Sequence, residues 1–272
     1  MRRAAAPGAV AVRRGARYRS NVPTLRWCFL GRVAYDAARA LQNRLAAQRA
    51  AEQCGDLLLL LEHPAVLTVG RHATLPAAGA VPVLRTDRGG KLTYHGPGQL
   101  VGYPVIGLGA AGRGVRDFVA RLEAALCDTA AVLGVAAHVR PGLPGVWTGA
   151  PGRERKLASI GLAVRRGVTL HGCALNLDRR AEDGFAGLDP CGLPGVQVTS
   201  LIAAGARDDV TVAGVAPLLA GALAVQLGLQ AERCRAESLS IDTLSDTSSS
   251  SSSAVPPSPA EVLSDHGHQP AP

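Results

Sequence analysis

Two lysines stand out in this sequence as side chains that could transfer a proton. The sequence has 29 lysine and arginine residues in total, and the only lysines among them are Lys91 and Lys156. A lysine can lose its proton when it is desolvated or lies beside another cation, whereas arginine stays charged. Lys156 opens the segment Lys-Leu-Ala-Ser-Ile-Gly, and Lys91 lies in a glycine-rich segment. We interpret both as candidate functional residues. The alternative is that these two lysines remained by chance during sequence drift and have no special role.

One of the six cysteines has a setting that suits a nucleophile. The cysteines lie far apart and form no CxxC pair, so the sequence predicts neither a zinc site nor a disulfide framework. Cys191 lies in an Asp-Pro-Cys-Gly-Leu segment, an expected turn from which its sulfur can project. Cys173 lies in an apolar stretch and is expected to pack in the core, as are Cys28, Cys54 and Cys127.

A nucleophilic thiol must first be ionised. The pKa of a free thiol is near 8.5, so only a small fraction is thiolate at pH 7. An ammonium beside Cys191 would lower that pKa, and Lys156 is the natural candidate. A cysteine–histidine pair with His95 or His171 is the alternative. Metal ligation by histidines is the weakest of the three readings, because none has the spacing of a known site, and no metal is predicted.

A glycine-rich segment runs from Arg88 to Gln99. It holds four glycines and a proline in twelve residues, a composition that predicts a loop rather than a helix or a strand. Arg, Thr, His and Gln side chains alternate with the glycines and can orient a bound group. We interpret the segment as a substrate-binding loop; the alternative is a tight structural connection.

The composition narrows the class of protein. The net charge of +8 and the pI near 9.7 favour an acidic partner. Aromatic residues make up only 3% of the chain and no recognition motif occurs, so an acidic protein is expected rather than nucleic acid. No GxGxxG or Walker loop occurs, which argues against a nucleotide cofactor. Val212 to Leu229 is uncharged, but its apolar residues recur at helical spacing, which predicts a buried helix rather than a membrane span.

The chain divides by composition into three parts. Residues 1–24 are a basic head that we expect to be disordered, with a mitochondrial transit peptide as the alternative. Residues 25–230 have the size of one globular domain. Residues 231–272 are expected to be a disordered tail rich in serine and proline. No secretory segment is recognised, so a cytoplasmic protein is expected, or a mitochondrial one if the head is a targeting signal.

The pattern of apolar residues predicts an α+β domain with a mixed sheet flanked by helices. Helices are expected at 33–53, 114–133 and 212–229, the last with Thr211 as its N-cap. Strands are expected at 57–61, 66–69, 81–84, 100–106, 146–148, 156–164 and 168–177, with the last two forming a hairpin.

Four segments, in order and spacing, closely resemble the lipoyl (octanoyl) transferase family. They are Arg88 to Gln99, Lys156 to Gly161, the His-Gly-Cys-Ala-Leu-Asn segment at 171–176, and the Pro-Cys-Gly segment at 190–192. The resemblance covers about Leu25 to Leu229 and implies the catalytic fold of lipoate and biotin protein ligases. Cys173 stands where members of the family often carry another small or apolar residue.

The resemblance also implies a reaction and a site. Octanoyl would pass from acyl carrier protein to a lysine of lipoyl domains, those of 2-oxo acid dehydrogenase E2 subunits and of the glycine cleavage H protein. Cys191 would form the acyl thioester and Lys156 would lower its pKa. The residues implied to line the acyl site are Arg88, Gly89, Gly90, Lys91, Leu92, Thr93, Tyr94, His95, Ser159, Ile160, Gly161, Gly172, Cys173 and Ala174.

Elementary chemistry agrees with this reading and leaves three rivals. An acyl thioester is already activated, so transfer needs no ATP, which agrees with the missing nucleotide motifs. An amidotransferase that moves octanoyl between lipoyl domains would use a cysteine on the same scaffold. An ATP-dependent lipoate ligase would need no such cysteine. A non-catalytic acyl-protein binding module would need neither Lys156 nor Cys191.

Overall fold

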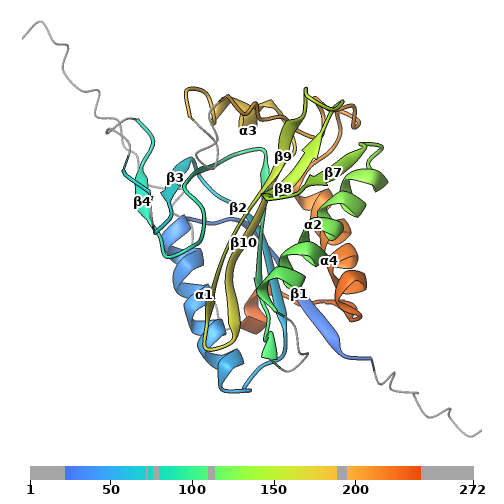
Figure 1. The fold of residues 1–272 in the computed structure, drawn as a ribbon. Helices are drawn as coiled ribbons and strands as arrows, with labels where there is room; N and C mark the ends of the chain where they lie inside the picture. Colours follow the sequence, from blue (N-terminus) through green and yellow to red (C-terminus); the bar gives the residue numbers. More distant parts are fainter. Residues whose placement is uncertain (1–21, 72, 76–79, 110–113, 189–194, 240–272) are drawn as a thin grey trace, which may run out of the picture. The chain divides into compact units, whose positions relative to one another are not determined.

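The computed structural model describes residues 22–71, 73–75, 80–109, 114–188 and 195–239. Its elements are β1 (Thr24–Arg32), α1 (Tyr35–Ala50), β2 (Leu57–Glu62), β3 (Val66–Val69), β4 (Val83–Arg85), β5 (Leu92–His95), β6 (Gln99–Val105), α2 (Val115–Val132), β7 (Ala137–Arg140), β8 (Leu143–Thr148), β9 (Arg155–Arg165), β10 (Val168–Asn176), α3 (Arg179–Asp183), α4 (Val212–Leu227), β11 (Gln230–Arg233) and the 3-10 helix η3 (Ala236–Leu239). Figure 1 shows these elements in chain order.

The strands form a large mixed sheet and a small one. The large sheet has eight strands in the order β11-β1-β2-β6-β10-β9-β8-β7, and the small sheet has the order β4-β3-β5. In the large sheet β1 runs parallel to both β11 and β2, while the remaining neighbours are antiparallel. This confirms the expected α+β architecture with a mixed sheet, and β9 and β10 form the expected hairpin.

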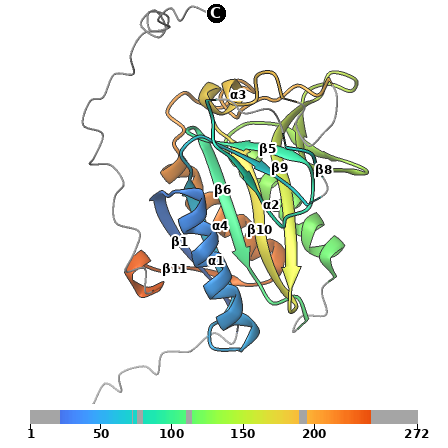
Figure 2. The same cartoon turned by 90° about the vertical axis from the view of Figure 1, so that its left-hand side faces the viewer.

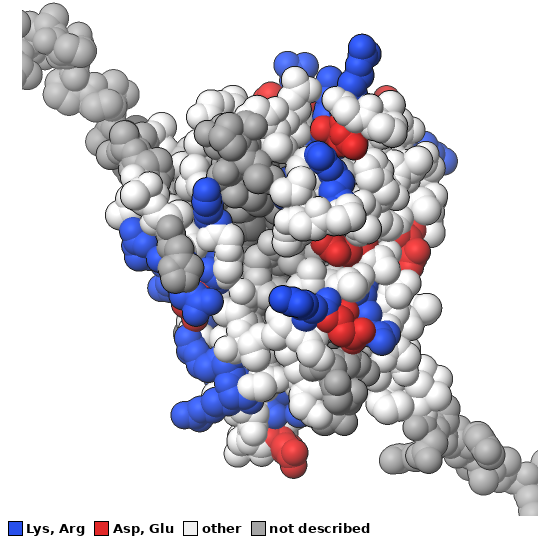
Figure 3. Space-filling view, in the orientation of Figure 1, with Lys and Arg blue, Asp and Glu red and all other residues white. Residues whose placement is uncertain are grey.

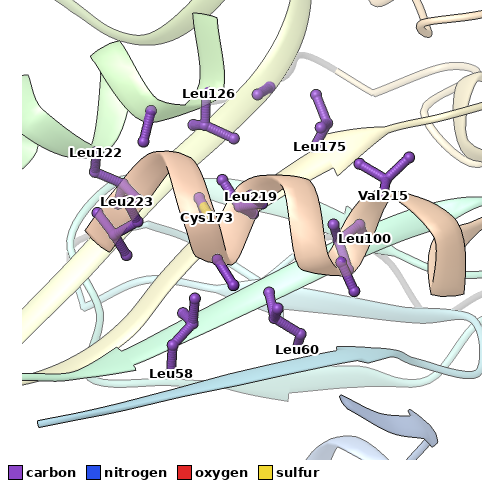
Figure 4. Packing of buried hydrophobic residues seen from close by; sticks show 14 of the residues in the cluster. Leu58, Leu60, Leu100, Leu122, Leu126, Cys173, Leu175, Val215, Leu219 and Leu223 are labelled. Carbon is purple, nitrogen blue, oxygen red and sulfur yellow. The ribbon is translucent and has the colours of Figure 1, made fainter. Parts of the chain in front are cut away.

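The helices cover the two faces of the large sheet unequally. Helices α2 and α4 pack together on one face, and α1 lies on the other, against β10 and β6 (Figures 1 and 2). The leucine run of β2 is buried on both faces, which explains why it is continuous rather than alternating. Leu58 and Leu60 point toward α4 within one apolar cluster (Figure 4).

Helix α4 shows how local signals and burial combine. The Thr211 hydroxyl accepts a hydrogen bond from the Gly214 N–H at 3.1 Å, as expected for an N-cap. Gly228 ends the helix with a φ of 70°, which suits a residue without a Cβ. Leu219 and Leu223 are fully buried against the sheet. Within the described ranges, no helix has both the length and the apolar character to cross a membrane.

Three strands depart from the sequence expectations. Leu92–His95, inside the glycine-rich segment, forms strand β5 because it pairs antiparallel with β3 along its whole length. Expecting no strand there was wrong. Strands β1 and β7 were not anticipated; β1 is stabilised by neighbours on both sides, and such long-range pairing leaves little signal in the local sequence.

The end of the domain also lies later than expected. Residues 230–233 form β11, which adds a parallel edge strand to β1, and η3 follows it. The boundary at residue 230 is therefore too early by nine residues, up to Leu239, because pairing with β1 orders a segment of low hydrophobicity. The predicted head, apart from residues 22–24, and the remainder of the predicted tail lie outside the described residues.

Candidate active site

The glycine-rich segment approaches strand β9 more closely than side chains would allow. The Gly89 N–H donates to the Leu162 carbonyl oxygen at 2.9 Å. A Cβ at Gly161 would lie 3.1 Å from the Gly89 carbonyl oxygen, and one at Gly70 would clash with the Gly90 carbonyl. Glycine is required at these positions for close backbone approach. The segment therefore rests directly on β9, whose first residues include Lys156.

A narrow cavity lies where the glycine-rich segment, β9 and β10 meet. Its lining joins residues far apart in sequence: Tyr35, Arg88, Thr93, His95, Tyr103, Ser159, Ile160, Gly161, His171, Gly172, Cys173 and Ala174. The structure thus brings three predicted segments of the acyl site into one wall. Tyr35 and Tyr103 were not predicted, because an isolated tyrosine on a helix or a buried strand gives no signal by itself. His171 was considered as a partner for the cysteine or a metal ligand and as the first residue of a family-like segment, but not as part of the acyl site.

Other predicted residues lie elsewhere. Gly89 and Gly90 line a second cavity, described below, rather than the first. Lys91 is exposed, and Leu92 is half-buried opposite Val69 in the small sheet. The Tyr94 ring packs edge-on against Phe185 at 5.8 Å, which links β5 to the turn that follows α3.

Cys173 contributes to the core rather than to chemistry. Its thiol is buried among the apolar residues under α4, and Figure 4 shows it beside Leu219. Burial raises the pKa of this thiol to about 12, so it stays protonated at neutral pH. The expectation that Cys173 packs in the core is confirmed. Its neighbour Gly172 is needed where β10 crosses Gly102 of β6, because a Cβ there would clash with the Gly102 carbonyl.

Arg88 anchors the start of the glycine-rich segment. Its side chain is only 5% exposed. The guanidinium donates from Nη2 to the Thr68 carbonyl oxygen at 2.6 Å and to the Thr68 hydroxyl at 2.8 Å. Nη1 donates to the Gly89 carbonyl oxygen at 2.9 Å. Buried hydrogen bonds from a charged donor are strong, so they fix the segment against the small sheet.

A chain of hydrogen bonds fixes the tautomer of His95. The Thr199 carbonyl oxygen can only accept, so Asn176 donates to it from Nδ2 at 3.0 Å. Asn176 Oδ1 then accepts from Gln99 Nε2 at 2.9 Å, which turns Gln99 Oε1 toward His95 Nδ1 at 2.8 Å. His95 Nδ1 must therefore carry the proton, and Nε2 is left as an acceptor. Complete burial lowers the pKa of His95 to about 3, so the ring is neutral at pH 7.

His63 is neutral for a similar reason. Its Nδ1 donates to the Val33 carbonyl oxygen at 2.6 Å, so its Nε2 accepts from the Tyr103 hydroxyl at 2.8 Å. Burial lowers the pKa of His63 to about 4. The ring lies 5.8 Å from that of His95 and 5.2 Å from that of Tyr35. His95 thus lines the cavity together with Tyr35 and Tyr103, and the uncharged His63 supports these rings from outside the lining.

His171 is the third histidine of this region. Its Nε2 lies 2.8 Å from Asp87 Oδ1, and Asp87 in turn pairs with Arg165 at 2.7 Å. Burial lowers the pKa of His171, although the Asp87 carboxylate acts in the opposite direction. Its backbone takes a φ of 58°, unusual for a residue with a side chain, and its N–H donates to Gln42 of α1 at 2.9 Å.

Lys156 is almost completely buried at the start of β9, with 2% of its surface exposed. Its Nζ donates to the Pro144 carbonyl oxygen at 2.8 Å and lies 4.8 Å from the centre of the Trp147 ring. A cation over an aromatic face is favourable once water is excluded. A Cβ at Gly145, whose φ is 120°, would come within 3.1 Å of Nζ. The surroundings are therefore shaped around the lysine side chain.

A second cavity, of about 370 Å³, opens beside Lys156. Besides Lys156, the cavity is lined by Gly89, Gly90, Val115, Val119, Gly142, Leu143, Pro144, Ile160, Gly161 and Leu162. Val115, the first residue of α2, is 45% exposed and belongs to this wall. Ile160 and Gly161 line both cavities. Lys156 thus lines the wider, apolar cavity, which shares Ile160 and Gly161 with the narrow one.

The backbone of Lys156 binds a distant segment. Its N–H donates to the Gln197 carbonyl oxygen at 2.8 Å, and its carbonyl oxygen accepts from the Thr199 N–H at 3.0 Å. Cys191, the predicted nucleophile, precedes Gln197 by six positions in the sequence and lies outside the described residues. In the described part of the chain, no group of three His, Cys, Asp or Glu residues is arranged to hold a metal ion.

Comparison with known proteins identifies the domain. The family described as the lipoyl protein ligase A/B catalytic domain matches residues 34–224. A protein from Nocardia farcinica named octanoyltransferase is 48% identical over 199 residues, covering 71% of this chain and 78% of that protein. A protein of the same name from Azotobacter vinelandii is 44% identical over 204 residues, covering 73% of this chain and 89% of that protein.

Solved structures show the same fold at low sequence identity. A bipartite lipoate protein ligase from Thermoplasma acidophilum superimposes with a TM-score of 0.58 at 18% identity, covering 80% of this chain and 90% of that chain. A lipoate-protein ligase A bound with ATP gives 0.55 at 16% identity, covering 80% and 92%. Together with the curated relatives, these matches show that the chain belongs to the octanoyltransferase family, on the catalytic fold of the lipoate protein ligases, and is an acyltransferase.

Proposed function

We propose that the protein transfers an octanoyl group from octanoyl-acyl carrier protein to a lysine of a lipoyl domain, through a thioester on Cys191. The acceptors would be the lipoyl domains of 2-oxo acid dehydrogenase E2 subunits and the glycine cleavage H protein. The observation that carries the proposal is the burial of Lys156, the chain's second lysine, in the wall of the wider cavity. A buried ammonium of this kind suits proton transfer better than structural support.

The position of Lys156 supports its pairing with Cys191. The main chain returns to Lys156 at Gln197, only six residues after the cysteine. Six residues span at most about 20 Å, so this tether limits how far the thiol can lie from the lysine. Within the described part of the chain, one N–H of the ammonium is used by Pro144. The ammonium would lower the pKa of the Cys191 thiol by favouring its charged form.

The reaction divides into two exchanges. In the first, the Cys191 thiolate attacks the carbonyl carbon of the octanoyl thioester, and the carrier leaves as a thiol after taking a proton from Lys156. In the second, the amine of the lipoyl lysine attacks the Cys191 thioester, and neutral Lys156 takes the proton that the amine loses. The first step exchanges one thioester for another, and the second forms an amide and releases free energy. Neither step requires a nucleotide.

The two cavities have different roles in this proposal. The wider cavity beside Lys156, of about 370 Å³ and lined by apolar side chains such as Leu143, Ile160 and Leu162, would take the acyl chain. Each buried methylene contributes about 0.8 kcal/mol. The narrow cavity, of about 20 Å³, has room for about one water molecule and is too small for that chain.

Charge on the surface favours acidic protein partners. Figure 3 shows lysine and arginine side chains gathered over α1 and β4. Arg39, Arg85 and Arg165 belong to these elements and to the adjoining hairpin, with 40% of the Arg39 side chain and 59% of the Arg165 side chain exposed. Acyl carrier proteins and lipoyl domains are typically acidic, so this surface would speed their encounter.

The test is a single-turnover labelling experiment. The purified protein is mixed with octanoyl-acyl carrier protein without ATP, and its intact mass and peptide map are measured. We expect one octanoyl group on Cys191, released on addition of an apo lipoyl domain. Cys191→Ser should remain unlabelled, while Cys54→Ser, at a partly buried position outside both cavities, should label normally.

The rival activities give different outcomes in the same experiment. An amidotransferase would stay unlabelled with acyl carrier protein but accept octanoyl from an octanoylated lipoyl domain. A ligase would act only with free octanoate and ATP, and Cys191→Ser would remain active. A binding module would hold the acylated protein stoichiometrically without turnover. Any of these three results would contradict the proposal.

A further inference from the structure

Cys28 and Cys234 lie side by side at the edge of the large sheet, away from both cavities described above. They follow the last residues that β1 and β11 pair in parallel, Trp27 and Arg233. The Cys234 N–H donates to the Trp27 carbonyl oxygen at 2.8 Å, which continues the ladder. Residues at matched positions of parallel strands present their side chains to the same face. The two side chains are therefore neighbours, close enough for each thiol to affect the ionisation of the other, and the Cys28 thiol donates to the Phe29 carbonyl oxygen at 3.9 Å.

The surroundings make the two thiols different. Cys28 is 1% exposed, whereas Cys234 is only partly buried. Interaction with Cys234 and burial raise the pKa of Cys28 well above its usual range. Interaction with Cys28, together with Arg26 and Ser238, lowers the pKa of Cys234 to about 6, although partial burial opposes this. Ionisation is therefore favoured at Cys234 over Cys28.

Charged and polar groups reach the pair from each element packed around it. Strand β1 contributes Arg26, β11 contributes Arg233, and η3 contributes Glu237 and Ser238. Arg26 Nη2 lies 3.4 Å from the Ser238 hydroxyl, which holds η3 over this edge. Glu237 opposes ionisation of Cys28, while Arg233 favours it. The balance around Cys234 is positive, as around reactive cysteines in general.

Cys234 is also accessible from outside. It lines an open cavity of about 580 Å³ together with Phe29, Arg233, Arg235, Ala236 and Glu237. A small polar reagent can therefore reach the thiolate, while Cys28 lies behind it in the sheet. An exposed thiolate with a second thiol in contact is the arrangement that allows stepwise oxidation to a disulfide.

We propose that Cys234 and Cys28 form a peroxide-reactive thiol pair that closes to a disulfide between β11 and β1. The Cys234 thiolate attacks one oxygen of the peroxide, the O–O bond breaks, and the second oxygen leaves as hydroxide, which is protonated to water. The resulting Cys234 sulfenic acid is then attacked by the Cys28 sulfur. The S–O bond breaks, a second water leaves, and the S–S bond forms. Two thiols and one peroxide thus become one disulfide and two waters.

The other thiols of the described chain lack this combination. Burial raises the pKa of Cys127 to about 11 and that of Cys173 to about 12, and it also raises the pKa of Cys54. Cys54 Sγ donates to the Leu45 carbonyl oxygen at 3.9 Å. These cysteines serve as internal controls for reactivity.

The disulfide would tie the last described strand to the first one. Three strands, β2, β6 and β10, separate β1 from β9, which carries Lys156. Oxidation should therefore raise the melting temperature while leaving the rate of acyl transfer unchanged. The bond closes a loop of about 200 residues, and constraints on long loops restrict the unfolded chain the most.

The test uses the full chain with Cys191→Ser, so that the proposed nucleophile does not contribute. After one equivalent of hydrogen peroxide, free thiols are alkylated and the protein is digested without reduction. We expect a peptide pair linked through Cys28 and Cys234, lost on addition of dithiothreitol. Adding Cys54→Ser should leave its yield unchanged. A yield no greater than that of linkages to other cysteines, or oxidation spread evenly over all of them, would overturn the proposal.

Two further measurements test the order of the steps. With Cys28→Ser, peroxide should stop at a Cys234 sulfenic acid that dimedone traps, and the rise in melting temperature should disappear. In the parent protein, iodoacetamide should alkylate Cys234 half-maximally near pH 6, ahead of Cys54; Cys28→Ser should move this midpoint upward. Sulfenic acid appearing on Cys28 rather than Cys234, or an unchanged midpoint, would contradict the assigned roles.

Discussion

The two sides of the large sheet are built from different kinds of side chain. On the apolar side, defined by the cluster under α2 and α4, leucines such as Leu122 and Leu219 interlock with almost no polar atoms. On the polar side, defined by the first cavity and the residues that support it, His63, His95 and Gln99 are also buried but form hydrogen bonds. The same sheet thus carries two interiors of opposite character.

The two interiors differ in whether their stabilising interactions depend on direction. Dispersion and burial on the apolar side are non-directional, so many arrangements of similar volume would stabilise it. On the polar side each hydrogen bond depends on another. The Thr199 carbonyl oxygen sets the orientation of the Asn176 side chain. Asn176 in turn orients Gln99, and Gln99 determines which nitrogen of His95 carries the proton. Such a network fixes the positions of atoms rather than adding much free energy.

The largest expected effect lies at Lys156, beyond the end of the polar side. Lys156→Arg keeps the positive charge, but an arginine cannot act as a base. Its guanidinium is also larger than the ammonium that fits beside Gly145. We expect kcat/KM for octanoyl transfer, compared per folded protein, to fall by about 10²- to 10⁴-fold, together with a lower melting temperature from overpacking. The control is Arg155→Lys at the exposed neighbouring position. Activity within a few-fold of the parent would remove Lys156 from proton transfer.

A deletion on the apolar side should have the opposite signature. Leu219→Ala removes a fully buried side chain from the centre of α4 and should lower the free energy of unfolding by about 2–5 kcal/mol. The folded fraction should transfer octanoyl at the parent rate, because Leu219 lies across the sheet from the polar cavity wall. Urea unfolding and initial rates at 25 °C measure both quantities. A strong loss of rate without loss of stability would break the division between the two sides.

The polar side should respond to pH where the apolar side does not. Both His63 and His95 are neutral when folded, with pKa values lowered to about 4 and about 3 by burial, below the unfolded value near 6.5. The unfolded chain therefore binds more protons, and stability falls as the pH drops below about 6.5. We expect about 2 kcal/mol lost per histidine between pH 7 and pH 5, measured by urea unfolding. His63→Gln should shrink this difference; equal stability at both pH values would contradict buried neutral rings.

The smallest expected effect is a gain. Gly221 lies within α4, and a Cβ there would meet no atom within 4 Å. Gly221→Ala should therefore raise the free energy of unfolding by about 0.5–1 kcal/mol, because alanine restricts the unfolded chain more than glycine does. The same exchange at Gly172, on the polar side, meets the Gly102 carbonyl and should destabilise the protein. A thermal melt distinguishes the two, and a gain at Gly172 would show that its close approach is not required.

Much of the architecture was readable from local sequence. The apolar periodicity of α2 and α4, the Thr211 cap and the hairpin between β9 and β10 were all predicted, and the structure confirms them. These features depend on contacts between residues near in sequence or on a single buried face. Strands β1, β5 and β11 were missed because their stability comes from partners far along the chain.

Some residues of the candidate site were likewise recognisable in the sequence, and others only in the structure. The unusual residue types of the glycine-rich segment and of Lys156 signalled it in the sequence, and the segments around Ser159 and Gly172 were grouped with them by resemblance. Tyr35 and Tyr103 gave no such signal, since their place in the wall follows from helix α1 and strand β6 crossing β10.

The sequence by itself determined the residue types that can carry an acyl group and a proton, because charge, thiol chemistry and glycine content belong to the residues. Only the tertiary structure decided which of them share a wall, which histidines stay neutral and which thiols meet. Desolvation and hydrogen-bond direction arise when distant strands pair, as in the burial of Lys156 and the pairing of β1 with β11 that brings Cys28 beside Cys234. Those two properties turn a set of reactive side chains into groups with assigned protonation states.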